Sequence, residues 1–123
     1  MTVFYDNDHI SRYKLVRGLM GGSERDPYRA AVAYLISLDE VLYTHRDSVF
    51  DFDKCVILPE GLHKPWQTST SQKTTRLASN LWCGFRYEDE SMALSPYYTP
   101  EHIFACEYAP YYWQAIKLRF ELD

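Results

Sequence analysis

The stretch DPYRAAVAYLISL, residues 26–38, decides the fold of this chain. Asp26 followed by Pro27 is typical of a helix start, because a carboxylate can cap the first turn and proline has the backbone angle of the first helical position. The residues from Tyr28 to Leu38 are apolar around most of the circumference of a helix. Since a helix without a polar face is buried, the sequence predicts a central helix here.

A first helix is predicted before this stretch, with Asn7 or Asp8 as its cap and Gly21-Gly22 as its end. Its apolar positions at helical spacing are Leu15, Val16, Leu19 and Met20.

A third helix is predicted after it, from about Leu38 to Ser48, because Ser37 and Glu40 have the spacing of a capping box. Residues 51–70 are expected to be irregular, apart from a short extended piece over residues 55–58 that Pro59 ends.

Two more helices are predicted in the second half. Ser69 and Gln72 also have capping-box spacing, and the helix that they would start carries an apolar face of Leu77, Ala78, Leu81 and Trp82. The last helix is expected to start at Thr99-Pro100, and Pro110 must kink or divide it. Together these patterns predict an all-α fold, a single domain over residues 1–123 with about five helices.

Composition limits the classes of function. The chain has 123 residues, a net charge of −4 and no apolar run approaching about 18 residues, so a membrane span is not expected and a cytoplasmic location is. Its three cysteines form no C-x-x-C pair, which fits a reducing compartment. Eleven Tyr, six Phe and three Trp either build the core or form a contact surface, and we favour the core.

The charges are segregated along the chain. Residues 61–87 carry four bases and no acid, whereas the segments 37–60 and 88–123 are acidic. This basic segment is a candidate contact surface for a partner, with the candidate residues Lys64, Trp66, Lys73, Arg76 and Arg86. Lys73 and Arg76 are expected on an exposed polar face of their helix. Direct nucleic-acid binding through residues 61–87 is a weaker interpretation, because four charges are few.

Histidine and cysteine residues offer a possible structural zinc site. His102 and Cys106 are four residues apart in the predicted last helix, so both would project from one face. Further ligands would have to come from elsewhere, with Cys55 and His63 as the leading candidates and Cys83 and His45 as others. A buried Cys106 beside a surface His102, without metal, is the favoured alternative.

Signals for catalysis are weak. Cys106 could act as a nucleophile only with a nearby histidine, such as His45, His63 or His102, and no glycine-rich elbow marks such a site. The acids Asp51, Asp53 and Glu88–Glu90 are interpreted as solvated loop charges.

The segments PEGL (59–62), WQTSTS (66–71), RLASNLW (76–82) and IFACEYAPYYWQAIKLRF (103–120) resemble an uncharacterised family of small proteins from prophages and integrative elements of Gram-positive bacteria. The resemblance covers most of the chain, and no catalytic residue can be carried over from it. It implies a counter-defence protein, similar to anti-CRISPR proteins, that binds a host defence effector without chemistry of its own. A small zinc-binding protein with a nucleic-acid-binding or enzymatic role is the alternative.

Overall fold

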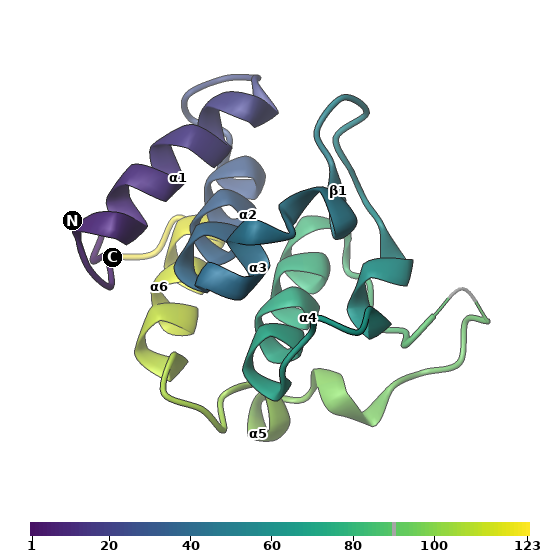
Figure 1. Ribbon diagram of the computed structural model, residues 1–123. Helices are drawn as coiled ribbons and strands as arrows, with labels where there is room; N and C mark the ends of the chain where they lie inside the picture. Colours follow the sequence, from purple (N-terminus) through teal and green to yellow (C-terminus); the bar gives the residue numbers. More distant parts are fainter. Residues whose placement is uncertain (90) are drawn as a thin grey trace.

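Helix α2, Pro27–Leu38, lies at the centre of the protein, with α1 (Asn7–Met20), α4 (Ser69–Cys83) and α6 (Ala109–Phe120) packed around it (Figure 1). This arrangement comes from a computed structural model, which describes residues 1–89 and 91–123. Every residue from Ala31 to Leu38 is buried. The prediction of a central, mostly apolar helix is therefore confirmed, and the domain is mostly helical as expected.

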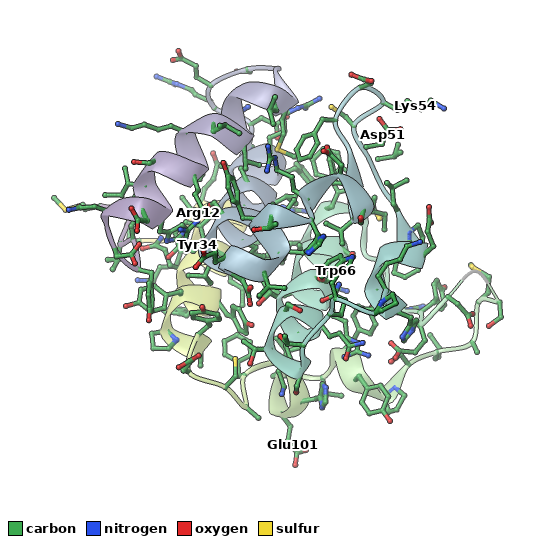
Figure 2. The ribbon with its side chains drawn as sticks, in the orientation of Figure 1. Arg12, Tyr34, Asp51, Lys54, Trp66 and Glu101 are labelled. Atoms are coloured by element: carbon green, nitrogen blue, oxygen red, sulfur yellow. The ribbon has the colours of Figure 1, made fainter. Side chains whose placement is uncertain are left out.

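The ends of α2 are held by side chains from both sides. Asp26 accepts hydrogen bonds from the backbone N–H groups of Tyr28 and Arg29, at 3.0 and 3.1 Å. At the other end, Nε of Arg12 in α1 donates to the Ser37 carbonyl at 2.7 Å (Figure 2). A cation at the C-terminal carbonyls is favoured by the helix dipole, so α1 and α2 stabilise one another there.

The inward face of α1 differs from the prediction. Val16 and Met20 are buried together with His9, but Leu15 and Leu19 are 45% and 47% exposed. The cap is Asp6 rather than Asn7 or Asp8, and its carboxylate accepts from the His9 N–H at 2.7 Å. The buried stripe therefore begins at His9, a polar residue that the hydrophobic pattern did not include.

The predicted capping box of Ser37 and Glu40 is wrong. Ser37 is fully buried within α2, and its hydroxyl donates to the Ala33 carbonyl at 2.7 Å because no water can reach it. Asp39 is the cap instead, accepting from the N–H groups of Val41 and Leu42. It starts the short helix α3, Glu40–Thr44, which the 3-10 helix η1, Arg46–Ser48, follows.

Residues 50–63 hold a small hairpin and a helical turn. Strand β1, Phe50–Asp51, pairs antiparallel with β2, Val56–Ile57. Of the two strands, β2 lies within the extended piece predicted over residues 55–58. The 3-10 helix η2, Pro59–His63, follows and leads into α4. The segment 51–70 is thus less irregular than expected.

The start of α4 lies one residue from the prediction. Thr68 is the cap and Ser71 completes the capping box, while Nε2 of Gln72 donates to the Leu62 carbonyl at 3.0 Å. Pro110 divides the last predicted helix into α5, Pro100–Ile103, and α6. The 3-10 helix η3, Pro96–Tyr98, precedes α5.

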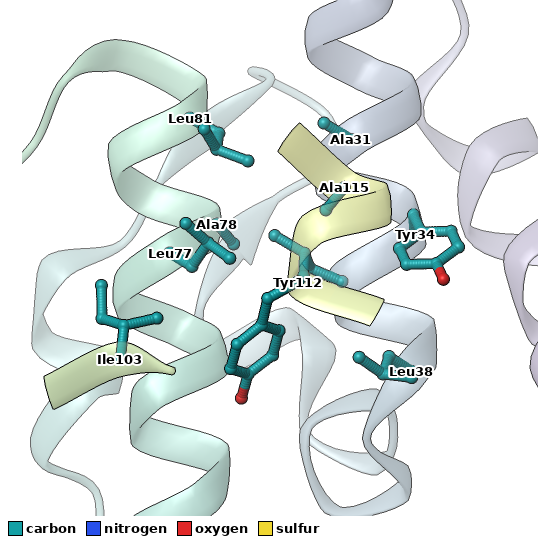
Figure 3. Packing of buried hydrophobic residues seen from close by; sticks show 10 residues of the cluster. Ala31, Tyr34, Leu38, Leu77, Ala78, Leu81, Ile103, Tyr112 and Ala115 are labelled. Carbon is teal, nitrogen blue, oxygen red and sulfur yellow. The ribbon is translucent and has the colours of Figure 1, made fainter. Parts of the chain in front are cut away.

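The core consists of two clusters on opposite faces of α2. One lies between α2, α4 and α6 and includes Tyr34, Leu38, Leu81 and Tyr112 (Figure 3). The other includes Val16, Val32, Ile36 and Phe50. Within the described residues, no helix has the length and apolar character needed to cross a membrane.

Candidate functional site

A polar pocket of about 310 Å³ lies where η2, α4, η3 and α5 meet. Two imidazoles, an ion pair and further polar side chains line it, and we call it the two-histidine pocket. Its lining includes His63, Gln72, Arg76, Glu88 and His102. Ser69 and Tyr97 complete it.

Arg76 and Glu88 form the structural centre of this pocket. Nε and Nη2 of Arg76 donate to the two carboxylate oxygens of Glu88, at 3.1 and 2.7 Å, and the guanidinium lies 5.0 Å from the centre of the Tyr97 ring. Burial acts to raise the pKa of Glu88, but hydrogen bonds from Arg76 and Ser95 and the charge of Arg76 outweigh it, so this pKa is lowered. Glu88 is therefore ionised at neutral pH.

The expected exposure of Arg76 is wrong, since only 5% of this residue is exposed. A buried guanidinium needs a counter-charge. Glu88 supplies it from a segment twelve residues further along the chain. No helical periodicity could have predicted that pairing.

The two histidines are held differently. His63 Nε2 lies 2.9 Å from the Glu88 carbonyl oxygen, so this nitrogen carries the proton and donates. The His102 ring lies 4.8 Å from the Tyr97 ring. Burial lowers the pKa of His102, the charges of Arg76 and Lys73 lower it further, and Glu88 acts in the opposite direction. These influences favour the neutral form of the His102 imidazole.

Lys73 lies at the edge of this pocket. Its Nζ donates to the Ser69 hydroxyl at 3.2 Å, one helical turn earlier. The pocket edge therefore carries a second cation besides Arg76.

The five residues of the predicted partner surface do not share one environment. Arg76 lines the two-histidine pocket, Lys73 lies at its edge, and Lys64 and Arg86 are exposed. Trp66 stacks on His45 with ring centres 4.4 Å apart and packs against the second core cluster (Figure 2). Lys64, Lys73 and Arg86 are thus the residues of this set that can present a free charge to a partner, since Arg76 is buried and paired with Glu88.

The predicted zinc ligands are only partly brought together. His63 and His102 line one pocket. Cys106 lies beyond the end of α5 at Ile103, so the helical spacing assumed for His102 and Cys106 is wrong. Its sulfur lies 3.5 Å from the Tyr112 hydroxyl, and Cys55 lies against the second core cluster. Among the described residues, no group of three or more His, Cys, Asp or Glu side chains could hold a metal ion.

The weaker catalytic candidates have structural partners. Asp51 accepts from the N–H groups of Asp53 and Lys54 in the hairpin turn (Figure 2). Glu88 pairs with Arg76. Glu90 lies outside the described residues. The Cys106 sulfur contacts the Ile103 carbonyl and the Tyr112 hydroxyl, and the described histidines form no hydrogen bond with it.

Sequence reasoning missed four residues of the pocket. Ser69 was interpreted only as a cap and Glu88 as a solvated loop charge, while Gln72 and Tyr97 were given no binding role. Ser69 and Gln72 lie in α4, whereas Glu88 comes from the segment after it and Tyr97 from η3, so no local spacing connects all four. The only available signal was the basic segment itself, which contains no acid of its own to neutralise Arg76.

No curated protein and no solved structure matches the chain. A family model described as a family of unknown function matches residues 1–123. The expected resemblance to an uncharacterised family is confirmed to that extent: the chain belongs to the family of unknown function DUF6075.

Proposed function

We propose that this protein is a non-enzymatic counter-defence protein of a mobile element, which acts in the cytoplasm of a bacterial host by binding and inhibiting a defence effector. A CRISPR–Cas nuclease is the effector to test first. The mobile-element origin and the type of effector rest on the resemblance described above. The site geometry supports binding rather than chemistry, because Arg76 occupies both oxygens of the pocket carboxylate Glu88.

The observation that best supports this function is an arm that protrudes from the helices. The arm consists of residues 85–89 and 91–95, extends away from the helices, and is closed by a bridge between Tyr87 and Leu94 (Figure 1). Met92 and Leu94 on this arm are 63% and 67% exposed. A partner that docks on this arm would bury both side chains, and the buried apolar area would stabilise the complex.

Two exposed cations lie on the arm or next to it. Arg86 is exposed on the arm itself, and Lys64 is exposed directly after η2, whose last residue His63 bonds the arm at Glu88. Asp89 on the same arm is exposed as well, so the charges around the tip are mixed, and the apolar contacts of Met92 and Leu94 rather than net charge would hold the complex.

The test uses purified chain in a DNA-cleavage assay with CRISPR nucleases, together with capture of the effector on the immobilised chain. Wild type should inhibit cleavage and retain the effector. The double substitution Met92→Ser with Leu94→Ser should weaken inhibition by about tenfold or more, because fully burying one Leu or Met side chain contributes about 1.5–3 kcal/mol.

The matched control is Leu15→Ser with Leu19→Ser, which removes two exposed leucines from α1. It should leave inhibition unchanged. Equal loss in both double variants would contradict the role of the arm, and wild-type chain that neither binds nor inhibits an effector would contradict the function.

The alternative, a zinc-binding protein with a nucleic-acid-binding or enzymatic role, has one favourable observation: His63 and His102 line the same pocket. Mass spectrometry of chain purified without a histidine tag distinguishes the two. Our proposal expects well below one zinc per chain. A stoichiometric zinc that is lost in a His63→Ala, His102→Ala variant would favour the alternative.

A further inference from the structure

We propose that the two-histidine pocket is a binding site for a phosphate group, carried either by a free nucleotide or by a nucleic-acid strand. The proposal concerns the chain alone and does not depend on the identity of a defence effector.

Hydrogen-bond donors converge on this pocket. Among the described residues, Glu88 occupies Nε and Nη2 of Arg76, and no protein acceptor occupies Nη1. Lys73 uses one of its three N–H donors on Ser69, whose hydroxyl, as the acceptor of that bond, keeps its own proton to donate. Arginine, lysine and hydroxyl donors around one hollow are the groups that recognise phosphate oxygens.

The guanidinium is already in place before a ligand arrives. Glu88 fixes it from one side, and the Tyr97 ring lies 5.0 Å from its carbon. A donor that is held rigidly loses little conformational entropy on binding, so its hydrogen bonds contribute more to affinity.

The charge balance favours an anion. Arg76 and Lys73 provide two positive charges, and Glu88 provides the negative charge of the pocket lining. Glu88 would repel a phosphate, but both its oxygens are engaged by Arg76. One net positive charge therefore remains among Arg76, Lys73 and Glu88, while the carboxylate of Asp89, which acts on His63, is exposed and screened by solvent.

The protonation of His102 should respond to a bound phosphate. The charged groups that act on it are Arg76 and Lys73 from α4 and Glu88 from the arm, and Tyr97 from η3 contacts its ring. His63 of η2 lines the same pocket. A phosphate placed among these groups would offset the two cations, so the His102 imidazole would take up a proton more readily in the complex.

The size and the lining favour more than inorganic phosphate. A volume of about 310 Å³ is at the lower end of the range for small-molecule sites and leaves room beyond a phosphate. Tyr97 is 45% exposed and its ring meets that of His102, so one aromatic surface beside the cations is available to a base.

The test is an NMR titration of the full chain with inorganic phosphate, adenosine monophosphate and a short single-stranded oligonucleotide, observing the imidazole signals of His63 and His102. Both signals should move with the mononucleotide or the strand, and the pKa of His102 should rise at saturation. Tighter binding of the mononucleotide assigns a free nucleotide, and tighter binding of the strand assigns nucleic acid.

Two variants test the pocket. Lys73→Gln and His102→Gln should each weaken binding about tenfold, the loss expected for one charge-assisted hydrogen bond. Lys64→Gln removes the same charge as Lys73→Gln from an exposed position whose side chain, unlike that of Lys73, bonds no lining residue in the described part of the chain, and it should change mononucleotide binding less than twofold, about the effect of a distant screened charge.

Two outcomes would overturn the proposal. One is that no probe at about 10 mM, a concentration above the weakest specific affinities, moves either imidazole signal. The other is that Lys64→Gln weakens mononucleotide binding as much as Lys73→Gln does, which would indicate diffuse attraction to a basic surface. Circular dichroism should show that each variant keeps its helical content.

Discussion

His9 shows how a single polar residue can hold two segments together in the core. It is fully buried, its Nδ1 accepts from the Tyr5 N–H at 3.0 Å, and its Nε2 lies 3.0 Å from the Tyr34 carbonyl oxygen. The first bond requires a bare Nδ1 and the second a protonated Nε2, so only the neutral Nε2–H tautomer satisfies both. The N-terminal segment is thereby tied to α1 and α2.

His9 should make stability depend on pH. Burial lowers its pKa from 6.5 to about 4, and the charge of Arg12 adds to this, while the Tyr34 hydrogen bond and Asp6 oppose it. Between these values the unfolded chain binds a proton that the folded chain does not, so stability rises with pH from about 4 to 6.5 and is lost as pH falls. The contribution at stake is about 3 kcal/mol.

Urea unfolding of wild type and a His9→Gln variant between pH 4 and 7 checks this. The glutamine variant should be less stable at pH 7 and should lose less further stability toward pH 4, because it cannot take up a proton there. The other groups with lowered pKa, Asp26, Glu88, Asp89 and His102, are the same in both chains, so the difference between the two slopes isolates His9. Parallel slopes would contradict the assignment.

Residue-scale errors in the sequence prediction share a cause. His9 and Arg76 are polar and were expected at the surface or left out of the core, yet both are buried. Each is buried because a partner from another element satisfies it, Tyr34 for His9 and Glu88 for Arg76. Such pairings over long separations are invisible to local periodicity.

At the scale of elements, the sequence was informative about which helices exist and less so about their ends. Proline and glycine located the start of α2, the end of α1 and the division before α6, because their backbone restrictions act locally. The caps of α1, α3 and α4 each differ from the prediction by a residue or two. Several adjacent Ser, Thr, Asp and Asn residues can cap equally well, so contacts elsewhere choose among them.

The cap of α4 offers a direct check. Thr68 Oγ1 accepts from the Ser71 N–H at 3.0 Å, whereas the Ser69 side chain receives only the Lys73 ammonium. Thr68→Ala should therefore cost about 1 kcal/mol of unfolding free energy. Ser69→Ala should cost a few tenths at most, the usual scale of an exposed change.

Thermal or urea unfolding of the two variants measures this difference. If Ser69→Ala proved the more damaging change, the helix would start one residue later, as the sequence pattern predicted.

At the scale of the molecule, the mostly helical domain could be predicted, but the two-histidine pocket could not. The pocket forms because α5 and η3 return to the first half of α4 and because the arm places Glu88 over Arg76. Composition indicated a basic segment, and this segment does supply Lys73 and Arg76. The acid that completes the site lies immediately outside it, in a segment that was assigned to the acidic part of the chain.

Helix α2 belongs to both core clusters, with Tyr34 and Leu38 in one and Val32 and Ile36 in the other. Neither cluster can keep its packing if α2 unfolds, because this helix contributes residues to both. The two clusters should therefore unfold in one cooperative transition. A destabilising substitution in one cluster would then lower the melting temperature of the whole domain, including the other cluster. The same coupling limits which substitutions a partner-facing surface can tolerate. A substitution that loosens either cluster should lower the stability of the whole domain.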